Sequence, residues 1–167
     1  MKKVSVWLVY IVLFALFFLW FSPKKLLYYK LEHILHQQQI ILSDETIYDN
    51  FFSFDVEDAK LFVKDIEVGQ ITKASLYPEL FINTLVIKNF NTNKNISLLP
   101  KIEIRKLIFF YTPFYPIKIF IKGEASDGEI KGSIELMKRK GFIDIASKKP
   151  LPLKKTKEGY YRYEFSY

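Results

Sequence analysis

An uncharged apolar run near the N-terminus constrains this chain more than any other feature. Residues 4–21 read VSVWLVYIVLFALFFLWF, without charge, proline or glycine, and a pair of lysines stands on each side. A run of about 18 such residues is the least that spans a hydrocarbon core of about 30 Å as a helix. We therefore expect residues 1–22 to be a transmembrane anchor, with Trp7, Tyr10 and Trp20 near the membrane surfaces.

The same run has a competing interpretation as a cleaved signal peptide. Cleavage needs small residues directly after the apolar run, whereas this run ends in the bulky residues 19–21. An uncleaved anchor is therefore favoured. The lysine flanks are balanced, so orientation is inferred from the short N-terminal tail, which favours a cytoplasmic N-terminus. These features predict a single-pass protein of the bacterial inner membrane with the bulk of the chain in the periplasm.

The next segment has a helical apolar period. Ser22 is a good N-cap and Pro23 suits the first helical position. Apolar residues then recur at helical spacing in 27–35, and Lys24 and Lys25 are placed to meet lipid headgroups. We expect a membrane-proximal amphipathic helix within residues 23–42, which either lies on the bilayer or packs on the following domain.

From about residue 46 the pattern changes to alternation of apolar and polar residues. Ile102 and Ile104, Ile117 to Ile121, and Ile130 to Leu136 are examples. Such alternation predicts half-buried strands. The hairpin signal Ser126-Asp127-Gly128 and the polar loop 89–95 separate them, and 117–146 reads as a three-stranded meander. The expected fold class is mainly β: residues 43–147 form a periplasmic antiparallel domain of about six to eight strands, either a curved or half-open sheet or a small sandwich.

The composition excludes several kinds of function. There is no cysteine, which rules out disulfides and thiolate metal sites. The chain has no Walker loop, GxSxG, HExxH or dinucleotide fingerprint, so we expect no enzyme, no cofactor and no catalytic or metal-binding residues. The net charge of +7 suits anionic lipid or an acidic partner. No nucleic-acid-binding motif accompanies it, so direct nucleic-acid binding is not expected.

Two polar clusters have a structural interpretation that outweighs the functional one. His33 and His36 lie one helical turn apart beside Glu32, but two imidazoles are fewer than the three or four ligands of a zinc site. The acidic segment 55–58 lacks the glycine and final glutamate of an EF-hand calcium loop, so a turn between strands is favoured.

Aromatic residues supply the candidate partner-binding positions. The segment 108–116 reads either as a buried strand with a proline-broken connection or as an exposed partner surface. The basic, tyrosine-rich tail, 148–167, ends in either a final strand or a partner-binding strand. The candidate residues are Phe109, Phe110, Tyr111, Phe114, Tyr115, Tyr161, Tyr163 and Phe165.

The order of elements and several short phrases resemble the type II secretion system protein N family. The phrases are KDIEV at 64–68, PELFIN at 78–83 and the hairpin 123–136, and the resemblance covers about 22–147. It implies an anchored helix that leads into a periplasmic β-sheet, in an inner-membrane accessory subunit without catalysis. A more distant resemblance is to AsmA-like β-groove proteins, the bridge-like lipid-transport class.

Two functions are therefore expected from different classes. The first is a non-catalytic accessory or assembly subunit of an envelope-spanning machine for type II secretion, type IV pili or DNA uptake. Its partners would be the inner membrane and other protein subunits of that machine. The alternative is a lipid-binding or lipid-transport β-groove protein of the bacterial envelope, whose sheet holds an acyl chain.

Overall fold

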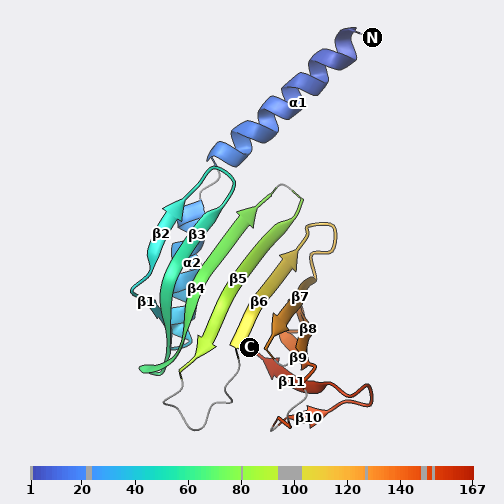
Figure 1. Cartoon of the computed structure of the whole chain (residues 1–167). Helices are drawn as coiled ribbons and strands as arrows, with labels where there is room; N and C mark the ends of the chain where they lie inside the picture. Colours follow the sequence, from blue (N-terminus) through green and yellow to red (C-terminus); the bar gives the residue numbers. More distant parts are fainter. Residues whose placement is uncertain are drawn as a thin grey trace.

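The computed structural model describes residues 2–21, 24–79, 81–93, 103–126, 128–147, 150–151 and 153–167. Within the helices it describes the side chains of 5–17, 24–26 and 28–37. Helix α1 stands apart from a broad sheet, and α2 lies behind that sheet (Figure 1). The helices are α1 (Lys2–Phe21) and α2 (Lys24–Gln37). The strands are β1 (Ile40–Ser43), β2 (Thr46–Asp49), β3 (Phe54–Val63), β4 (Ile66–Pro78), β5 (Asn83–Thr92), β6 (Glu103–Tyr111), β7 (Lys118–Ala125), β8 (Gly128–Glu135), β9 (Lys140–Ile145), β10 (Lys154–Lys155) and β11 (Tyr161–Ser166).

The prediction of a membrane anchor is contradicted. Among the residues described here, no helix is long and apolar enough to cross a membrane. The expected location, single-pass in the bacterial inner membrane with the bulk of the chain periplasmic, is therefore wrong.

All the strands in the part of the chain that the structure describes belong to one open antiparallel sheet. Its order is β1-β3-β4-β5-β6-β7-β8-β9-β11-β10, and β2 also pairs with β3. From β3 to β9 each strand pairs with the next one in the chain, which confirms the mainly β, antiparallel prediction and the meander over 117–146. Counted over the described residues, the sheet has 11 strands rather than the expected six to eight, because segments 40–49 and 154–166 also form strands.

The strand register sorts the side chains onto two faces, because directly paired residues project to the same side of a sheet. One face, here called the inner face, is apolar along almost its whole width. From β4 to β11 it carries Ile71, Ala74, Leu76, Leu85, Ile87, Phe90, Ile104, Leu107, Phe109, Tyr111, Ile119, Ile121, Gly123, Ala125, Ile130, Gly132, Ile134, Gly141, Ile143, Ile145, Tyr161, Tyr163 and Phe165. The opposite side, the outer face, carries most of the charged residues.

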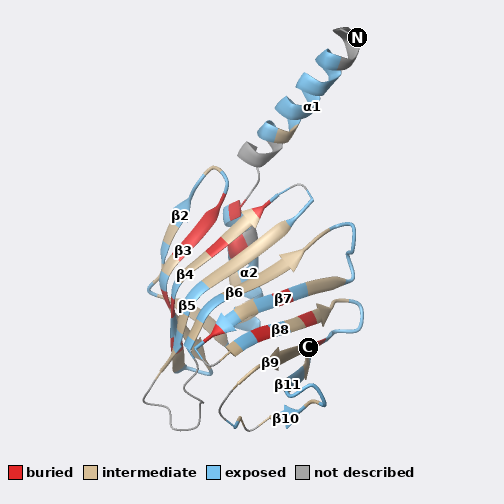
Figure 2. Ribbon diagram, turned by 45° about the vertical axis from the view of Figure 1, so that its right-hand side comes forward, coloured by how far each residue is buried: buried red, intermediate tan, exposed pale blue. Residues whose placement is uncertain are grey.

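The sheet curves around its inner face. Strands β7–β9 are narrow in Figure 1 and broad in Figure 2, and in both views α2 lies behind the strands, inside the curve. Inner-face glycines permit close approach of neighbouring strands. A Cβ on Gly132 would lie 2.4 Å from the backbone oxygen of Phe142, and one on Gly123 would lie 2.7 Å from that of Lys106. A side chain at either position would therefore push the strands apart.

A line of irregular positions crosses four strands. The regular pairs skip Asp58, Thr72, Asn89 and Arg105, which follow one another from β3 to β6. Asp58 and Asn89 have φ of 57° and 52°, and the Thr72 hydroxyl donates to the Asn89 carbonyl at 3.3 Å. At each of these positions the alternation of inner-face and outer-face residues shifts by one residue. The two segments of each strand, before and after the irregular position, therefore both direct their apolar residues to the inner face.

Helix α2 covers only one end of that inner face. Tyr28 packs on Phe54 with ring centroids 5.2 Å apart, in a buried cluster with Val56, Ala59 and Ile71. The residues that pack around this cluster come from β1 to β5. In Figure 2 the buried segments of β3 and β4 lie in front of α2. Helix α2 therefore packs on the domain, one of the two placements expected for it.

The side chain of Lys24 is buried against the turn between β2 and β3. It is 5 % exposed, its ammonium donates to the backbone oxygens of Asn50 and Phe51, the latter at 2.7 Å, and it lies 3.7 Å from an Asp49 carboxylate oxygen. These contacts satisfy a buried ammonium and join the start of α2 to the turn between β2 and β3. The expectation that this lysine meets lipid headgroups is therefore corrected.

Other expectations need smaller corrections. Helix α2 ends at Gln37, and part of the segment expected to be helical forms β1. The acidic segment 55–58, expected in a turn, lies within β3. Ser22, Pro23, Asp127 and residues 94–95 of the polar loop lie outside the described residues.

Candidate functional site

Helix α2 leaves the inner face beyond β5 uncovered. The inner-face side chains on β6 to β11 are mostly half-buried, and Tyr163 is 51 % exposed. Ile121 and Ile130 are fully enclosed by their neighbours. None of the described elements packs across these strands on the inner side, since α2 makes its contacts at the β1–β5 end. Uncovered apolar surface of this extent normally meets a ligand or a partner.

Charge is almost absent from this surface. In the regular cross-strand pairs from β4 to the edge strand β10, Lys155 is the one charged residue on the inner face. It lies opposite Tyr161, with its ammonium 5.8 Å from the centre of that ring. Among these described pairs, the inner face is therefore an apolar surface with a single cation at its open edge.

The eight aromatic candidates do not form one site. Five lie on the inner face: Phe109 and Tyr111 on β6, and Tyr161, Tyr163 and Phe165 on β11. Phe110 points to the outer face, whereas Phe114 and Tyr115 lie in the connection between β6 and β7. The structure therefore brings five of the eight candidates onto one surface. The sequence could not distinguish Phe109 from its neighbour, because both are aromatic and alternation alone does not say which is inside.

The outer face carries a smaller aromatic patch. The Phe120 ring lies 6.4 Å from that of Phe110 and 6.2 Å from that of Tyr115. Beside it, Ile108, Phe110, Phe120 and Lys122 line an open depression of about 340 Å³. At the tip of the neighbouring loops Phe81 and Phe114 stack at 5.5 Å. Phe120 and Phe81 were not among the candidates, because each stands alone in an ordinary alternating or loop segment.

Ion pairs across the outer face are structural. Asp55 Oδ2 accepts a hydrogen bond from Asn50 at 3.0 Å and lies 3.2 Å from the Lys73 ammonium. Burial of this carboxyl acts to raise its pKa, but hydrogen bonds from Ser75 and Lys73 outweigh burial and hold the pKa below its usual range. The carboxylate therefore stays ionised and holds β3 to β4.

Neither polar cluster weighed from the sequence forms a reactive centre. His33 lies 3.1 Å from the Gln37 amide nitrogen on the exposed side of α2. In the part of the chain that the structure describes, no group of three or more His, Asp or Glu residues is close enough to hold a metal ion.

Sequence reasoning missed Ile143 and Ile145, which lie on the inner face, and Lys155, which lies at the edge of that face. Ile143 and Ile145 alternate with Asp144, which indicates a strand. This alternation does not say which face of the sheet the two isoleucines join. Only the register with β8 and β11 shows that they join the same surface as β6 and β7.

No family model matches the chain, and neither does any curated protein or solved structure. The resemblance to the type II secretion system protein N family thus stays a prediction.

Proposed function

We propose that this chain binds an amphiphile, such as a lipid, by laying its apolar chain along the inner face of the sheet, which then acts as an open β-groove. The observation that carries the proposal is the apolar inner face of β6 to β11, which α2 leaves uncovered. Burying such surface is favourable by roughly 25 cal/mol per Å², so a long alkyl chain gains several kcal/mol there.

The dimensions of the surface support a chain-shaped ligand. Neighbouring strands lie about 4.8 Å apart, so the five spacings from β6 to the edge strand β10 span roughly 24 Å. Half-buried isoleucine and tyrosine side chains occupy this whole width, without a charged residue before Lys155. An alkyl chain needs contact along its length and no hydrogen bonds, which is what such a surface supplies.

The test measures binding of oleate and of oleyl alcohol to the full chain by native mass spectrometry. Tyr163→Glu places a charge on the exposed part of the inner face and should weaken binding of both ligands by about tenfold, since a carboxylate is costly to bury beside an alkyl chain. Met137→Glu is the matched control, because Met137 is 83 % exposed in the turn between β8 and β9. Absence of binding by either ligand would refute the proposal.

A second candidate is the non-catalytic accessory subunit of a secretion, pilus or DNA-uptake machine. The observation that favours it is the open sheet, whose edge strands β1, β2 and β10 each pair on one side only within the described residues. An unpaired edge can accept a strand from another chain. In this function the edge binds another subunit, and the inner face need hold no ligand.

Photo-crosslinking distinguishes this candidate. A crosslinking residue at Tyr48, exposed on the edge strand β2, should capture one defined subunit whose complex re-forms from purified components. The same residue at Tyr29, exposed on α2, should not capture it. Equal capture at both positions, or none, would argue against edge pairing.

A further inference from the structure

We propose that the ligand of the inner face is anionic, and that Lys155 binds its charged group at the open edge of the sheet. The inference rests on the proposed function, because it assigns the head of the amphiphile whose chain the inner face holds. The occupant is a single-chain amphiphile with one anionic group, for which a long-chain fatty acid is the simplest chemistry.

The register places Lys155 where a head group would lie. One inner-face row runs from Ile130 on β8 through Ile145 and Tyr161 to Lys155 on the edge strand β10. Ile130 is 3 % exposed, whereas Lys155 is exposed to solvent. The row therefore passes from an enclosed apolar end to a solvated cation, the polarity of a fatty acid from its tail to its carboxylate.

The charge of Lys155 is not used within the domain. Several outer-face lysines are neutralised by carboxylates, among them Lys60 by Asp44 at 2.6 Å and Lys73 by Glu57 at 2.8 Å. Within the described part of the chain Lys155 has no ion pair, and its ammonium contacts the ring of Tyr161. Its ammonium is thus free to meet an anion, and the apolar surroundings of the row strengthen that attraction relative to water.

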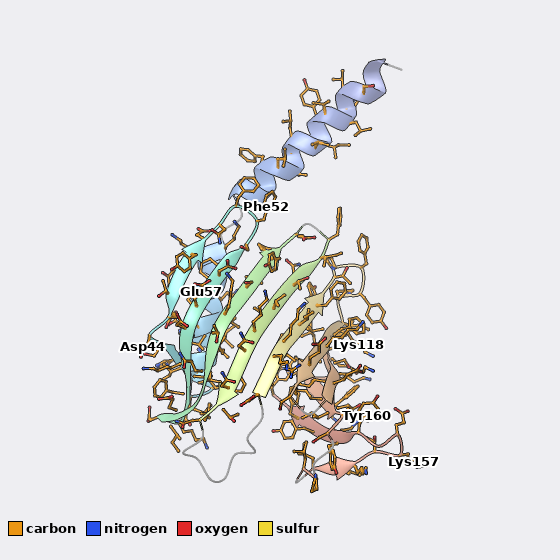
Figure 3. All side chains as sticks on the ribbon, viewed as in Figure 1. Asp44, Phe52, Glu57, Lys118, Lys157 and Tyr160 are labelled. Atoms are coloured by element: carbon orange, nitrogen blue, oxygen red, sulfur yellow. The ribbon has the colours of Figure 1, made fainter. Side chains whose placement is uncertain are left out.

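The adjacent lysines do not share this position. Lys154, the other residue of β10, is paired with Arg162 and therefore lies on the outer face. Lys157 lies at the tip of the loop between β10 and β11, away from the sheet (Figure 3). Lys154 and Lys155 are consequently a matched pair of neighbouring lysines on β10 whose side chains lie on opposite faces of the sheet.

The experiment compares oleate with oleyl alcohol, which has the same chain but no charge, on the full chain at pH 8. The wild type should bind oleate about three- to tenfold more tightly than oleyl alcohol. Lys155→Gln should abolish this preference while leaving oleyl alcohol binding unchanged. Lys154→Gln should keep the preference, because its charge lies on the other face.

The outcomes separate this inference from the proposed function. The proposal of an anionic head group bound by Lys155 is overturned if the wild type binds both ligands with equal affinity, or if the preference for oleate survives Lys155→Gln. Either result leaves the binding of the alkyl chain intact. If Lys154→Gln loses the preference for oleate as fully as Lys155→Gln does, the basic tail attracts the anion as a whole. That result also overturns the assignment of the head group to Lys155. If neither ligand binds at all, the proposed function itself fails.

Discussion

Arg162 and Asp144 lie directly opposite each other on β11 and β9, joined by two hydrogen bonds. The guanidinium donates from Nε to Oδ1 and from Nη2 to Oδ2, each at 2.7 Å, and lies 4.5 Å from the centre of the Phe142 ring. Two parallel charge-assisted bonds fix both distance and orientation. This pair therefore holds the last strand, and the aromatic residues on its inner face, in register.

Removing the guanidinium should loosen β11 without unfolding the domain. In Arg162→Leu, we expect the backbone amides of 161–166 to exchange with deuterium faster, while those of β4 to β7 keep their protection. Glu164→Gln, on the same face of β11 but outside this pair, is the control and should leave exchange unchanged. Unaltered exchange in Arg162→Leu would mean that backbone pairing alone holds the strand.

Asp55 should make folding stability dependent on pH in the acid range. Its pKa is held below the usual value in the folded state, by hydrogen bonds from Ser75 and Lys73 that outweigh the effect of burial. Its contribution is therefore complete above the unfolded pKa of about 4, and is lost as the pH falls through the folded value.

Thermal unfolding of Asp55→Asn and the wild type between pH 7 and pH 3 tests this. The variant should be less stable at pH 7, and the gap should narrow below about pH 4, as the wild-type carboxylate becomes protonated. Glu158→Gln, in the loop between β10 and β11, is the control. The difference in stability between this variant and the wild type should not narrow as the pH falls. A gap that is constant over the range would contradict the role of the ionised carboxylate.

Gly132→Val should destabilise the domain by about 1–3 kcal/mol, the usual cost of overpacking. The new Cβ would meet the Phe142 backbone oxygen at 2.4 Å on the inner side of the curve. Lys131→Val, the neighbouring position on the outer face, should have a much smaller effect, because Lys131 is exposed there. Urea unfolding measures both, and equal effects would show that curvature at β8 does not depend on the glycine.

Two substitutions at Tyr28 separate its ring from its hydroxyl. Tyr28→Phe removes only the hydrogen bond to Glu45 (3.0 Å) and should cost about 1 kcal/mol. Tyr28→Ala also removes the ring that packs on Phe54 and should cost about 3–5 kcal/mol. Denaturant unfolding followed by circular dichroism gives both values. Similar losses in the two variants would show that α2 is held by the hydroxyl and not by the ring.

The local pattern of the sequence was sufficient for the strands and their antiparallel order. Alternation in 117–121 and 130–136 predicted β7 and β8, and short turns between them required neighbouring strands to pair. The same local pattern failed at 55–58, where acidic residues resemble a turn but lie on the outer face of β3. It also suggested membrane placement for Lys24, which is instead buried against the turn after β2.

The sequence by itself determined that this chain forms an antiparallel sheet whose strands each have an apolar side, because alternation is a local property of a pleated backbone. Only the tertiary structure decided that these sides join into one curved inner face, that β11 adds to it, and that Lys155 rather than Lys154 lies at its edge. These facts depend on register between residues distant in the chain. A shift of one residue would reverse every side chain of a strand, and no single segment records that choice.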